Sequence, residues 1–472
     1  MRFEKLLRED IPRFIPYYRN QKTKISNFTL SFLFMWFRHQ NAMYALTDGC
    51  LIIREKFVNM PYFHYPLSLT GDDEEAEARA LDSLEKYCRE TNERLHFTNV
   101  PAEKLCTLAA RYGADLHISN SRRWRDYLYE ADDFKNYPGG KYSGQRNHVN
   151  KFNKEHPDSV FCVYEEKDLP EALAFLEEYA ASRPEKDSFS ATEEMKAAAE
   201  LMPHVKELGL VCGFMRAGGK MISLSVGERC GDMMVIVIEK ALREYRGAYP
   251  ATAQMFAKTF CDGVRYINRE DDAGDLGLRK SKLQYLPCRL VDKYNLVPHR
   301  AIDALSYFPE MRTKRLTLCG IAKEDAAVYA RLAKDDELNK YWGYDWRKDA
   351  PKKLTDAWFY KDALRDFSKK KEIREGVYFE GALIGEAVLH NFGYRAEAEI
   401  GVRILREMQG RGFAREALVG LMEYAFSKLN LERIEAKCFK ENTPSERALL
   451  AAGMHRAGED DTFYYFYKTA AM

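Results

Sequence analysis

The 472-residue sequence lacks the motifs of several common classes of site. Its 10 cysteines are scattered, with no two inside the spacing of a CxxC redox motif or a zinc ribbon. Its 10 histidines are equally dispersed, and no HExxH, GxSxG or Walker A motif occurs. We therefore expect no metal site and no α/β-hydrolase nucleophile. The cysteines are expected to be reduced and to act as small apolar side chains.

Long apolar runs and an excess of charge of one sign are also absent. The most apolar segment, 28–37, is about half the length of a membrane span and favours a core element. The charged N-terminal residues lack the apolar run of a signal peptide. Lysine plus arginine (73) nearly balance aspartate plus glutamate (72), which does not indicate a globally basic nucleic-acid binder. These absences predict a soluble, cytoplasmic protein without an integral membrane segment.

The length is sufficient for about three domains. Apolar residues make up 46% of the chain, so each domain can bury an ordinary core. The segment 296–312 carries two prolines and shows no sustained periodicity, which is typical of a linker. We therefore divide the chain into domains at 1–295 and 313–472.

Helix and strand patterns alternate in both halves. Residues 396–405 alternate between apolar and polar positions, which is the strand period. From Ala414 onward the apolar positions recur on one helical face. Further strands are predicted at 210–216, 221–228, 233–239, 315–318, 375–379, 383–392 and 433–439. Further helices are predicted at 74–91, 165–181, 251–261 and 323–334. The expected fold class is α/β (α+β), with mixed sheets flanked by helices.

The stretch 405–418 joins a predicted strand to a predicted helix through Gly410 and Gly412. A glycine turn that opens a helix directs several backbone N–H groups to one place, which suits a phosphate-like anion. The helix dipole contributes only about 0.3–1 kcal/mol for an exposed charge, so the N–H hydrogen bonds would do most of the holding. The alternative is a plain strand-to-helix turn.

The context of this turn resembles the acetyl-CoA motif of the GNAT N-acetyltransferases. The motif is Gln/Arg-x-x-Gly-x-Gly/Ala, which falls on Gln409, Gly412 and Ala414. The later segment 442–445, Asn-Thr-Pro-Ser, resembles the second half of the same fold. Arg315-Leu316 is similar to the start of the ribosomal-protein N-terminal acetyltransferase branch.

The resemblance covers about 313–468 and implies acetyl-CoA as cosubstrate. The acceptor would be an amine on a small molecule or a peptide. The strand backbone would pair with pantetheine, and the loop N–H groups would hold the CoA pyrophosphate. The implied CoA-binding residues are Ile404, Gln409, Gly410, Arg411, Gly412, Phe413, Ala414 and Asn442.

Acetyl transfer needs a base for the amine and a proton for the leaving thiolate. Glu397 and Glu399 share one strand face, so either could act as the base, directly or through water. Ordinary exposed strand carboxylates are the alternative interpretation. Many relatives carry a tyrosine acid where this sequence has Leu449, and Met454 replaces the usual phenylalanine. Ser445 is then the candidate acid, unless it only caps a helix.

In the first half, residues 266–282 place a run of carboxylates before a run of basic residues. Such a run usually forms a solvated face. Its glycines and its strand-like entry favour instead a formed loop. Mixed charge in such a loop could bind a polar ligand that carries both an amine and a phosphate or carboxylate.

Residues 238–249 and 266–282 resemble the soluble catalytic domain of bacterial phosphatidylglycerol lysyltransferases, which move an aminoacyl group from charged tRNA to a lipid. The shared pattern is Glu-Lys-Ala…Gly-x-Tyr, then Asn-x-Glu-x-Asp-x-Gly…Leu-Arg-x-x-Lys. It implies two GNAT-like lobes, at about 1–135 and 136–295, and hence three lobes in tandem. The implied substrate-binding residues are Arg146, Asn147, Glu239, Tyr249, Asn268, Glu270, Asp271 (or Asp272), Arg279 and Lys282.

Together the resemblances predict an acyltransferase with two modules. The second acetylates an amine, and the first performs aminoacyl-type transfer, with aminoacyl-tRNA as a partner contacted through the basic run 141–154. Two alternatives stay open. The first half could be a non-catalytic module that binds a ligand or partner for the second, or the second half could sense CoA without catalysis. The acceptor and the oligomeric state are left open.

Overall fold

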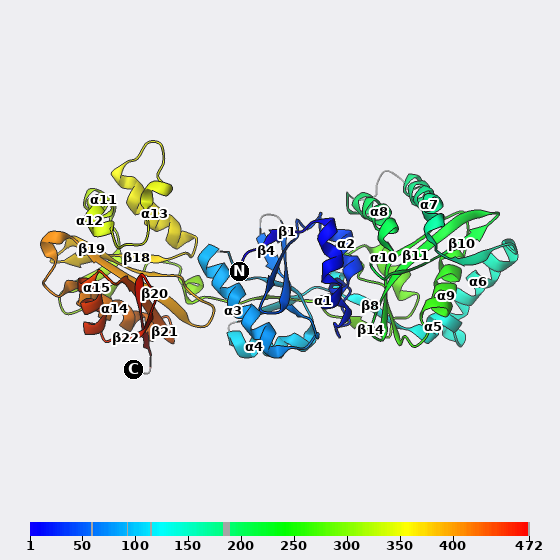
Figure 1. The fold of residues 1–472 in the computed structure, drawn as a ribbon, viewed down its shortest axis with the longest axis horizontal. Coiled ribbons are helices and arrows are strands. Elements are labelled where there is room, and N and C mark those ends of the chain that lie inside the picture. Colours follow the sequence, from blue (N-terminus) through cyan, green and yellow to red (C-terminus); the bar gives the residue numbers. More distant parts are fainter. Residues whose placement is uncertain (58–59, 92, 114–115, 183–188, 471–472) are drawn as a thin grey trace. The chain divides into compact units, whose positions relative to one another are not determined.

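The computed structural model describes residues 1–472 apart from 58–59, 92, 114–115, 183–188 and 471–472. The chain divides into two compact units. The first comprises residues 1–87, 94–110 and 116–297, and the second comprises 88–93, 111–115 and 298–472. Among these described residues, the first unit contains two sheets and the second contains one (Figure 1).

The first lobe is built on a sheet of order β1-β2-β3-β4-β6-β15-β7, with β5 paired to β3. Its strands are β1 (Glu4–Lys5), β2 (Met43–Thr47), β3 (Cys50–Phe57), β4 (Met60–Phe63), β5 (Leu67–Ser68), β6 (Phe97–Val100), β7 (His117–Asn120) and β15 (Tyr294–Val297). Its helices are α1 (Ile15–Arg19), α2 (Leu30–Trp36), α3 (Glu74–Thr91) and α4 (Leu105–Tyr112).

The second lobe has a sheet of order β14-β8-β13-β12-β11-β10-β9. Its strands are β8 (Asp126–Glu130), β9 (Val160–Val163), β10 (Val211–Ala217), β11 (Lys220–Cys230), β12 (Met233–Ala241), β13 (Tyr266–Asn268) and β14 (Arg289–Val291). Its helices are α5 (Ala131–Asn136), α6 (Ser143–Glu155), α7 (Leu169–Ala181), α8 (Phe189–Leu201), α9 (Ala248–Phe260) and α10 (Leu276–Leu283).

The C-terminal unit has a sheet of order β16-β17-β18-β19-β20-β21-β23-β22. Its strands are β16 (Met311–Arg312), β17 (Leu316–Gly320), β18 (Ile373–Phe379), β19 (Ala382–His390), β20 (Glu397–Ile404), β21 (Arg433–Phe439), β22 (His455–Glu459) and β23 (Phe463–Thr469). Its helices are α11 (Ala326–Lys334), α12 (Asp336–Asn339), α13 (Asp356–Ser368), α14 (Phe413–Ser427) and α15 (Thr443–Ala451).

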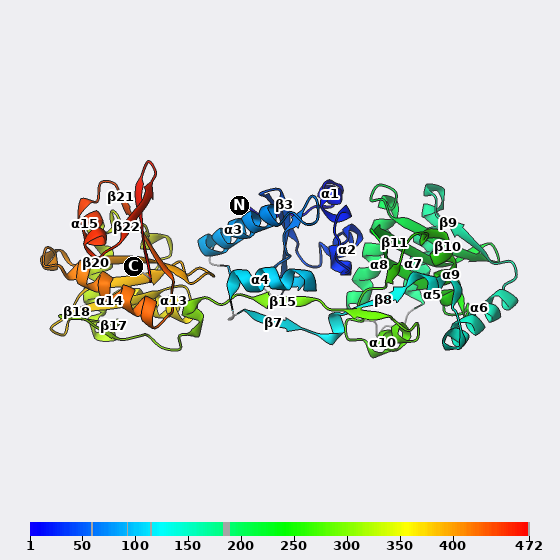
Figure 2. The same cartoon turned by 90° about the horizontal axis from the view of Figure 1, so that it is seen from below.

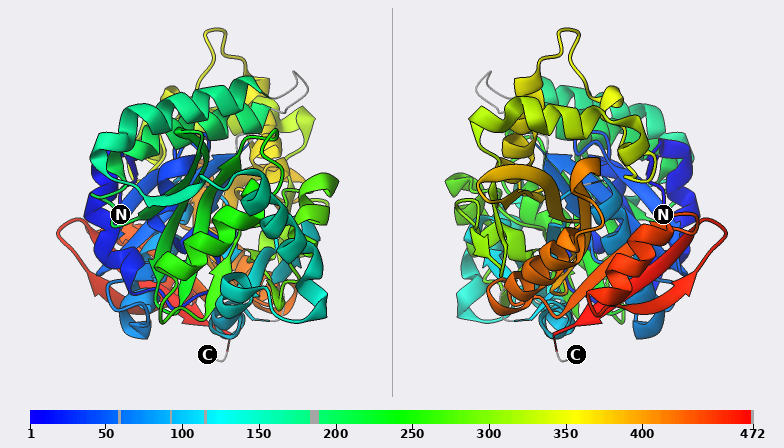
Figure 3. Two further views of the ribbon diagram at one scale, coloured as in Figure 1. Left: turned by 90° about the vertical axis from the view of Figure 1, so that its right-hand side faces the viewer. Right: turned by 90° about the vertical axis from the view of Figure 1, so that its left-hand side faces the viewer.

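One supersecondary pattern recurs in all three sheets. Each is mainly antiparallel, but each contains a parallel pair: β4 with β6, β12 with β13, and β20 with β21. A helix, α3, α9 or α14, connects the two strands of each pair, as a parallel crossover requires. The right-hand view in Figure 3 shows α14 (orange) lying along its sheet. The expected α/β (α+β) class with three GNAT-like lobes in tandem is confirmed.

The two lobes of the first unit are not consecutive segments of the sequence. β8, at 126–130, lies before the expected lobe border at 135 but pairs with β13 and β14 of the second sheet. β15 returns to the first sheet between β6 and β7. The expected linker 296–312 thus begins inside β15 and ends in β16, and Ile302 is buried in the C-terminal core. Local periodicity carries no signal for a strand that inserts between distant partners.

Residues 30–36 of the apolar run 28–37 form α2, most of which is buried, so the interpretation as a core segment is confirmed. Among the described residues, no helix is long and apolar enough to span a bilayer. The buried Glu228 of the second lobe accepts hydrogen bonds from the N–H groups of Leu30 (3.1 Å) and Ser31 (2.7 Å) at the start of α2. A carboxylate at a helix N-terminus is a favourable contact, and here it joins the two lobes.

Candidate functional site

The glycine loop of the C-terminal unit connects β20 to α14. Gly410 (φ 74°) and Gly412 (φ 79°) adopt left-handed conformations, and Gly412 is the residue before the helix. The side-chain amide of Gln409 donates to the carbonyl of Ile404 (2.9 Å), which folds the loop back on the strand. The N–H groups of the first helical turn have no acceptor within a helix, so they are available to an anion.

Arg315, in the bend between β16 and β17, braces this loop. Its guanidinium donates to the carbonyl of Arg411 (3.1 Å), pairs with Glu416 (2.7 Å) and lies over the ring of Phe413 at 4.5 Å. The hydroxyl of Thr313 also donates to Glu416 (2.6 Å). Burial tends to raise the pKa of Glu416, but these hydrogen bonds outweigh it and lower the pKa. The brace fixes the loop and places a positive charge beside it.

Most of the residues predicted for CoA binding and catalysis line one cleft. They are Glu399, Ile404, Gln409, Gly410, Gly412, Phe413, Ala414, Asn442 and Ser445. Arg411 contributes its carbonyl to the contact with Arg315, and Glu397 begins β20 in register with Arg433 of β21. The cleft therefore runs from the parallel strand pair to the glycine loop.

Asn442 has a structural task in this geometry. Its side-chain oxygen accepts from the backbone N–H of Ser445 (3.3 Å), so Asn442 caps α15. Leu449, at the position where relatives carry a tyrosine, is 4% exposed and belongs to the core. Met454 is 2% exposed and fills the same core. Ser445, the acid predicted from the sequence, is a polar residue of α15 that lines the cleft.

His390, at the end of β19, was not predicted from the sequence. It lies opposite Glu399 in the strand ladder, with its Nε2 3.9 Å from a Glu399 carboxylate oxygen. Lys437 of β21 approaches the same carboxylate at 3.8 Å. Burial lowers the pKa of His390, and the charge of Glu399 opposes part of that shift. A neutral imidazole beside a carboxylate is suited to accept a proton. Register alone reveals this pair.

The other end of the cleft is charged and aromatic. The buried Glu386 pairs with Arg403 (3.1 Å), whose guanidinium lies over Trp342 at 4.5 Å. Arg374 pairs with Asp362 (3.1 Å) and Asp366 (2.8 Å), and also with Glu372. Burial raises the pKa of Glu372. Arg365 also pairs with Asp362, and Lys371 lies 3.7 Å from Asp366, so the carboxylates at this end of the cleft are matched by cations.

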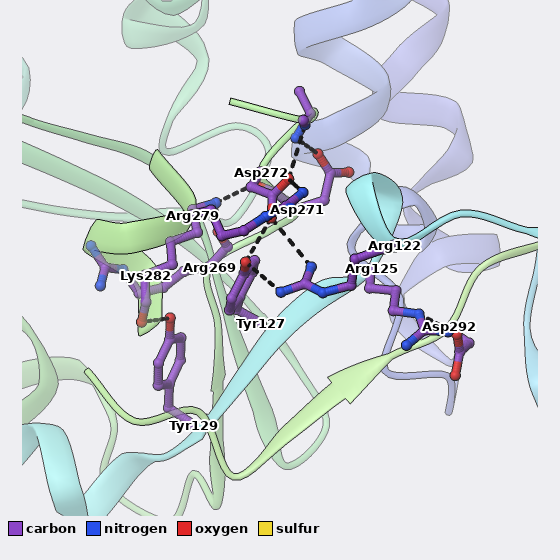
Figure 4. A network of polar contacts seen from close by, with 12 residues as sticks. Arg122, Arg125, Tyr127, Tyr129, Arg269, Asp271, Asp272, Arg279, Lys282 and Asp292 are labelled. Atoms are coloured by element: carbon purple, nitrogen blue, oxygen red, sulfur yellow. Dashed lines mark hydrogen bonds and ion pairs between the residues drawn. The ribbon is translucent and has the colours of Figure 1, made fainter. Parts of the chain in front are cut away.

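In the N-terminal unit, a buried carboxylate organises the charged loop between β13 and α10 (Figure 4). Arg279 forms two hydrogen bonds with Asp272, both of 2.8 Å. Arg122 (3.2 Å) and the hydroxyl of Tyr127 (2.6 Å) donate to the same carboxylate. Burial tends to raise the pKa of Asp272, but hydrogen bonds from Arg279, Tyr127 and the Gly274 N–H hold it well below its usual range.

A second set of contacts surrounds the neighbouring lysines. Lys293, 5% exposed, pairs with Asp126 (2.6 Å) and Asp271 (3.0 Å). Lys282 donates to the carbonyls of Arg269 (2.5 Å) and Asp271. Burial lowers the pKa of Lys282. Asp272 therefore contacts Arg279, whereas Asp271 contacts Lys293, and which of the two aspartates belongs to the substrate-binding set stays a prediction.

Asn268 and Glu270 lie at the start of this loop. The Asn268 amide donates to the Lys24 carbonyl (2.8 Å) and to Asp126 (3.0 Å), and its oxygen accepts from the Glu270 N–H (2.7 Å). Glu270 has a left-handed backbone (φ 56°), and one of its carboxylate oxygens is buried without a hydrogen-bond partner in the described part of the chain. Burial raises the pKa of Glu270, which nearby Lys282 partly opposes.

The remaining predicted residues make separate contacts. Glu239 pairs with Arg269 (3.0 Å), and the Tyr249 hydroxyl lies 3.3 Å from that of Tyr179. Arg146 donates to the carbonyl of Gly139 (2.6 Å), and Asn147 is exposed on α6. Four network partners were not predicted, because the pairing of β8 with β13 and with β14 brings them to the loop: Arg122, Asp126, Tyr127 and Lys293.

Comparison with known proteins agrees with both halves of this geometry. The family model described as "Phosphatidylglycerol lysyltransferase, C-terminal" matches residues 18–297, and the model "Acetyltransferase (GNAT) domain" matches residues 315–455. The uncharacterised N-acetyltransferase YoaA of Bacillus subtilis (strain 168) is 32% identical over 154 residues, which cover 32% of this chain and 85% of that protein. The uncharacterised N-acetyltransferase p20 of Bacillus licheniformis is 33% identical over 153 residues, 31% of this chain and 82% of its own.

A crystal structure of a conserved protein of unknown function from Bacteroides thetaiotaomicron VPI-5482 shares the fold. It covers 62% of this chain and 98% of its own, with a TM-score of 0.57 and 23% identity. The protein therefore belongs to the phosphatidylglycerol lysyltransferase C-terminal family and carries a second, GNAT acetyltransferase domain, which makes it an acyltransferase.

Proposed function

We propose that the C-terminal unit transfers an acetyl group from acetyl-CoA to an amine. The observation that carries this proposal is the glycine loop. Its two left-handed glycines open α14 with a set of N–H groups, and Gln409 and Arg315 hold it rigid. The N–H groups of 410–414 would hold the pyrophosphate, with pantetheine along β20 towards Ile404.

In this proposal the amine attacks the thioester carbonyl carbon, the C–S bond breaks and the thiolate leaves with a proton. His390 and Glu399 take the amine proton, directly or through a water, because they form a polar pair at the edge of the cleft. Ser445, which lines the cleft, donates a proton to the leaving thiolate from its hydroxyl, because Leu449 has no proton to donate. Glu397 remains a second candidate base.

The proposal is tested by following thiol release from acetyl-CoA with a panel of amines, comprising polyamines, amino-acid amides and basic peptides. We expect amine-dependent release in the wild type and its loss in Gly412→Glu. Thiol release that no amine accelerates would leave a unit that binds CoA without transfer, and would refute the proposal.

A second candidate function is aminoacyl transfer by the N-terminal unit. It is favoured by Glu270, whose buried, unpartnered carboxylate oxygen and raised pKa lie beside Lys282, whose pKa is lowered. Perturbed titratable groups of this kind gather at functional sites. Labelled aminoacyl-tRNA should lose its amino acid to an added acceptor, and Glu270→Gln should abolish that loss while the exposed Glu166→Gln does not. A wild type that transfers no amino acid would make the unit a binding module, and a Glu270→Gln variant that matches an active wild type would exclude Glu270 from the chemistry.

A further inference from the structure

Part of the cleft in the C-terminal unit is floored by a short ladder of residue pairs. Alternate residues of a strand lie on one face, and cross-strand partners share that face. Three successive pairs of β19 and β20 therefore lie in a row, and all six residues line the cleft: His390 with Glu399, Val388 with Gly401, and Glu386 with Arg403. The first pair is the proposed proton acceptor and the third is a buried ion pair, so the middle pair lies between the reacting centre and a fixed charge.

Trp342, which follows α12, lies over the middle pair. A Cβ on Gly401 would be 3.5 Å from the indole and 3.2 Å from Val388. The guanidinium of Arg403 lies over the same ring, 4.5 Å from a ring centroid. The backbone of Gly401 is not left-handed, so its conformation does not require a glycine. What the missing side chain provides is space beneath the indole.

Asn339 fixes the position of this indole. The Trp342 N–H donates to the Asn339 carbonyl (3.0 Å). The side-chain amide of Asn339 donates to the carbonyls of Ala333 (2.8 Å) and Asp335 (2.6 Å), and its side-chain oxygen accepts from Arg403. The segment that carries Trp342 is therefore tied to α11 and to β20. Figure 1 shows α12 above the sheet and α14 below it, and the view from below in Figure 2 shows α14 on the near side. The indole thus covers β20 on the face opposite α14.

We infer that Trp342 restricts the acyl group of the donor to the size of acetyl. The inference rests on the proposed acetyl transfer, in which pantetheine follows β20 from the glycine loop. The thioester carbon must then lie within reach of the amine that His390 and Glu399 deprotonate, which brings the acyl group beside Gly401. There the indole leaves little space above the strand, so each further methylene would have to displace a side chain that is held in place.

The test is a calorimetric titration of the full chain with CoA, acetyl-CoA, propionyl-CoA and butyryl-CoA, a measurement that needs no acceptor amine. We expect the wild type to bind CoA and acetyl-CoA with similar affinity. Propionyl-CoA should bind at least about tenfold more weakly, and butyryl-CoA more weakly still. Trp342→Ala should bind all four with similar affinity, because the space over Gly401 is then open.

Trp358→Ala is the matched control. Trp358 also lines the cleft, but it packs on Phe359 of α13, with 5.0 Å between the rings, so its loss should keep the wild-type order of affinities. Gly401→Ala should weaken acetyl-CoA binding, and Trp342→Ala in the same chain should restore part of it. Thermal unfolding checks that each variant folds. Trp342→Phe, which keeps a smaller ring, should relax the order by a smaller factor and decides the case if the alanine variant does not fold.

Equal wild-type affinity for the three acyl-CoA esters would overturn the inference and leave the proposed acetyl transfer intact. A folded Trp342→Ala variant that still rejects butyryl-CoA would also overturn it. A wild type that binds neither CoA nor any ester would instead refute the CoA site, and the inference with it.

Discussion

Asp272 illustrates how residues of a predicted binding set can hold each other in place. Its buried carboxylate accepts from Arg279, Arg122 and Tyr127, so Arg279 is already engaged within the protein. Glu270, by contrast, keeps a buried oxygen without a partner. Substrate binding by Arg279 stays a prediction, and Glu270 is the residue on which the chemistry of the N-terminal unit is best tested.

Asp272→Asn should lower the free energy of unfolding by about 2–3 kcal/mol, because it leaves guanidinium donors without their charged partner while both arginines keep some contact with water. Since the folded-state pKa of Asp272 is depressed, its contribution is present above the unfolded-state value near 3.8 and is lost as the pH falls towards the folded-state pKa. The free energies of unfolding of the wild type and the variant, measured with urea, should therefore become equal in acid. The exposed Asp132→Asn is the control, and a pH-independent difference would contradict this account.

His390→Gln should lower kcat for amine acetylation by about 10²–10³-fold while acetyl-CoA affinity is retained. Because Glu399 raises the pKa of His390, Glu399→Gln should shift the acidic limb of the pH–rate profile to lower pH. The positive charges of Lys437 and Arg374 also lower the pKa of His390, so they add to this shift. The exposed His455→Gln serves as control. An unshifted limb in Glu399→Gln would remove His390 from the role of base.

The second lobe and the C-terminal unit each enter a helix through a glycine with the same backbone conformation, but the space around the two turns differs. Gly247 before α9 and Gly412 before α14 both have left-handed backbones. A Cβ on Gly247 would lie 2.4 Å from the carbonyl oxygen of His148 on α6, whereas at Gly412 the nearest atom is 3.6 Å away on the flexible Arg315. In the second lobe α6 closes the turn, and in the C-terminal unit the turn stays open to a ligand.

Gly247→Ala should therefore cost about 2–4 kcal/mol of stability through a backbone clash and a strained φ. Gly412→Ala should cost about 1–2 kcal/mol through the φ alone. Chemical unfolding measures both values. Equal costs would mean that α6 can move away, and that the second-lobe turn is as open as the turn at Gly412 in the C-terminal unit.

Elements with strong periodicity or clear borders were predictable from sequence. The helix 74–91 and the strand 433–439 match α3 and β21. α6 was seen only as a basic polar run, since its buried apolar residues are Val149 and Phe152. β15, four residues long and inserted between β6 and β7, has no local signature.

For the first unit as a whole, the contacts that unite its lobes link residues more than a hundred positions apart. Glu228 joins α2, and Asp126 meets Lys293. The glycine loop could be predicted because its residues are consecutive. The contacts of Asp272 with Arg122 and Tyr127, and the pairing of His390 with Glu399, could not, because strand register and crossover topology bring these residues together.

Glu228→Ala should loosen the two lobes of the first unit, at a cost of about 2–4 kcal/mol, because it leaves two buried amide donors without an acceptor. Amide hydrogen exchange at Leu30 and Ser31 should accelerate selectively. The exposed Glu166→Ala is the control. Unchanged exchange at these two amides would show that Glu228 does not hold the lobes.

The most direct test of the central claim is a calorimetric titration of acetyl-CoA into the full chain, with Gly412→Glu and Gly381→Glu in parallel. Both glycines have left-handed backbones in the same unit (φ 79° and 82°), but Gly381 lies in the turn between β18 and β19. We predict one-to-one binding by the wild type and by Gly381→Glu, and its loss in Gly412→Glu. Absence of binding to the wild type, or equal binding by Gly412→Glu, would contradict the assignment of the glycine loop as the CoA site.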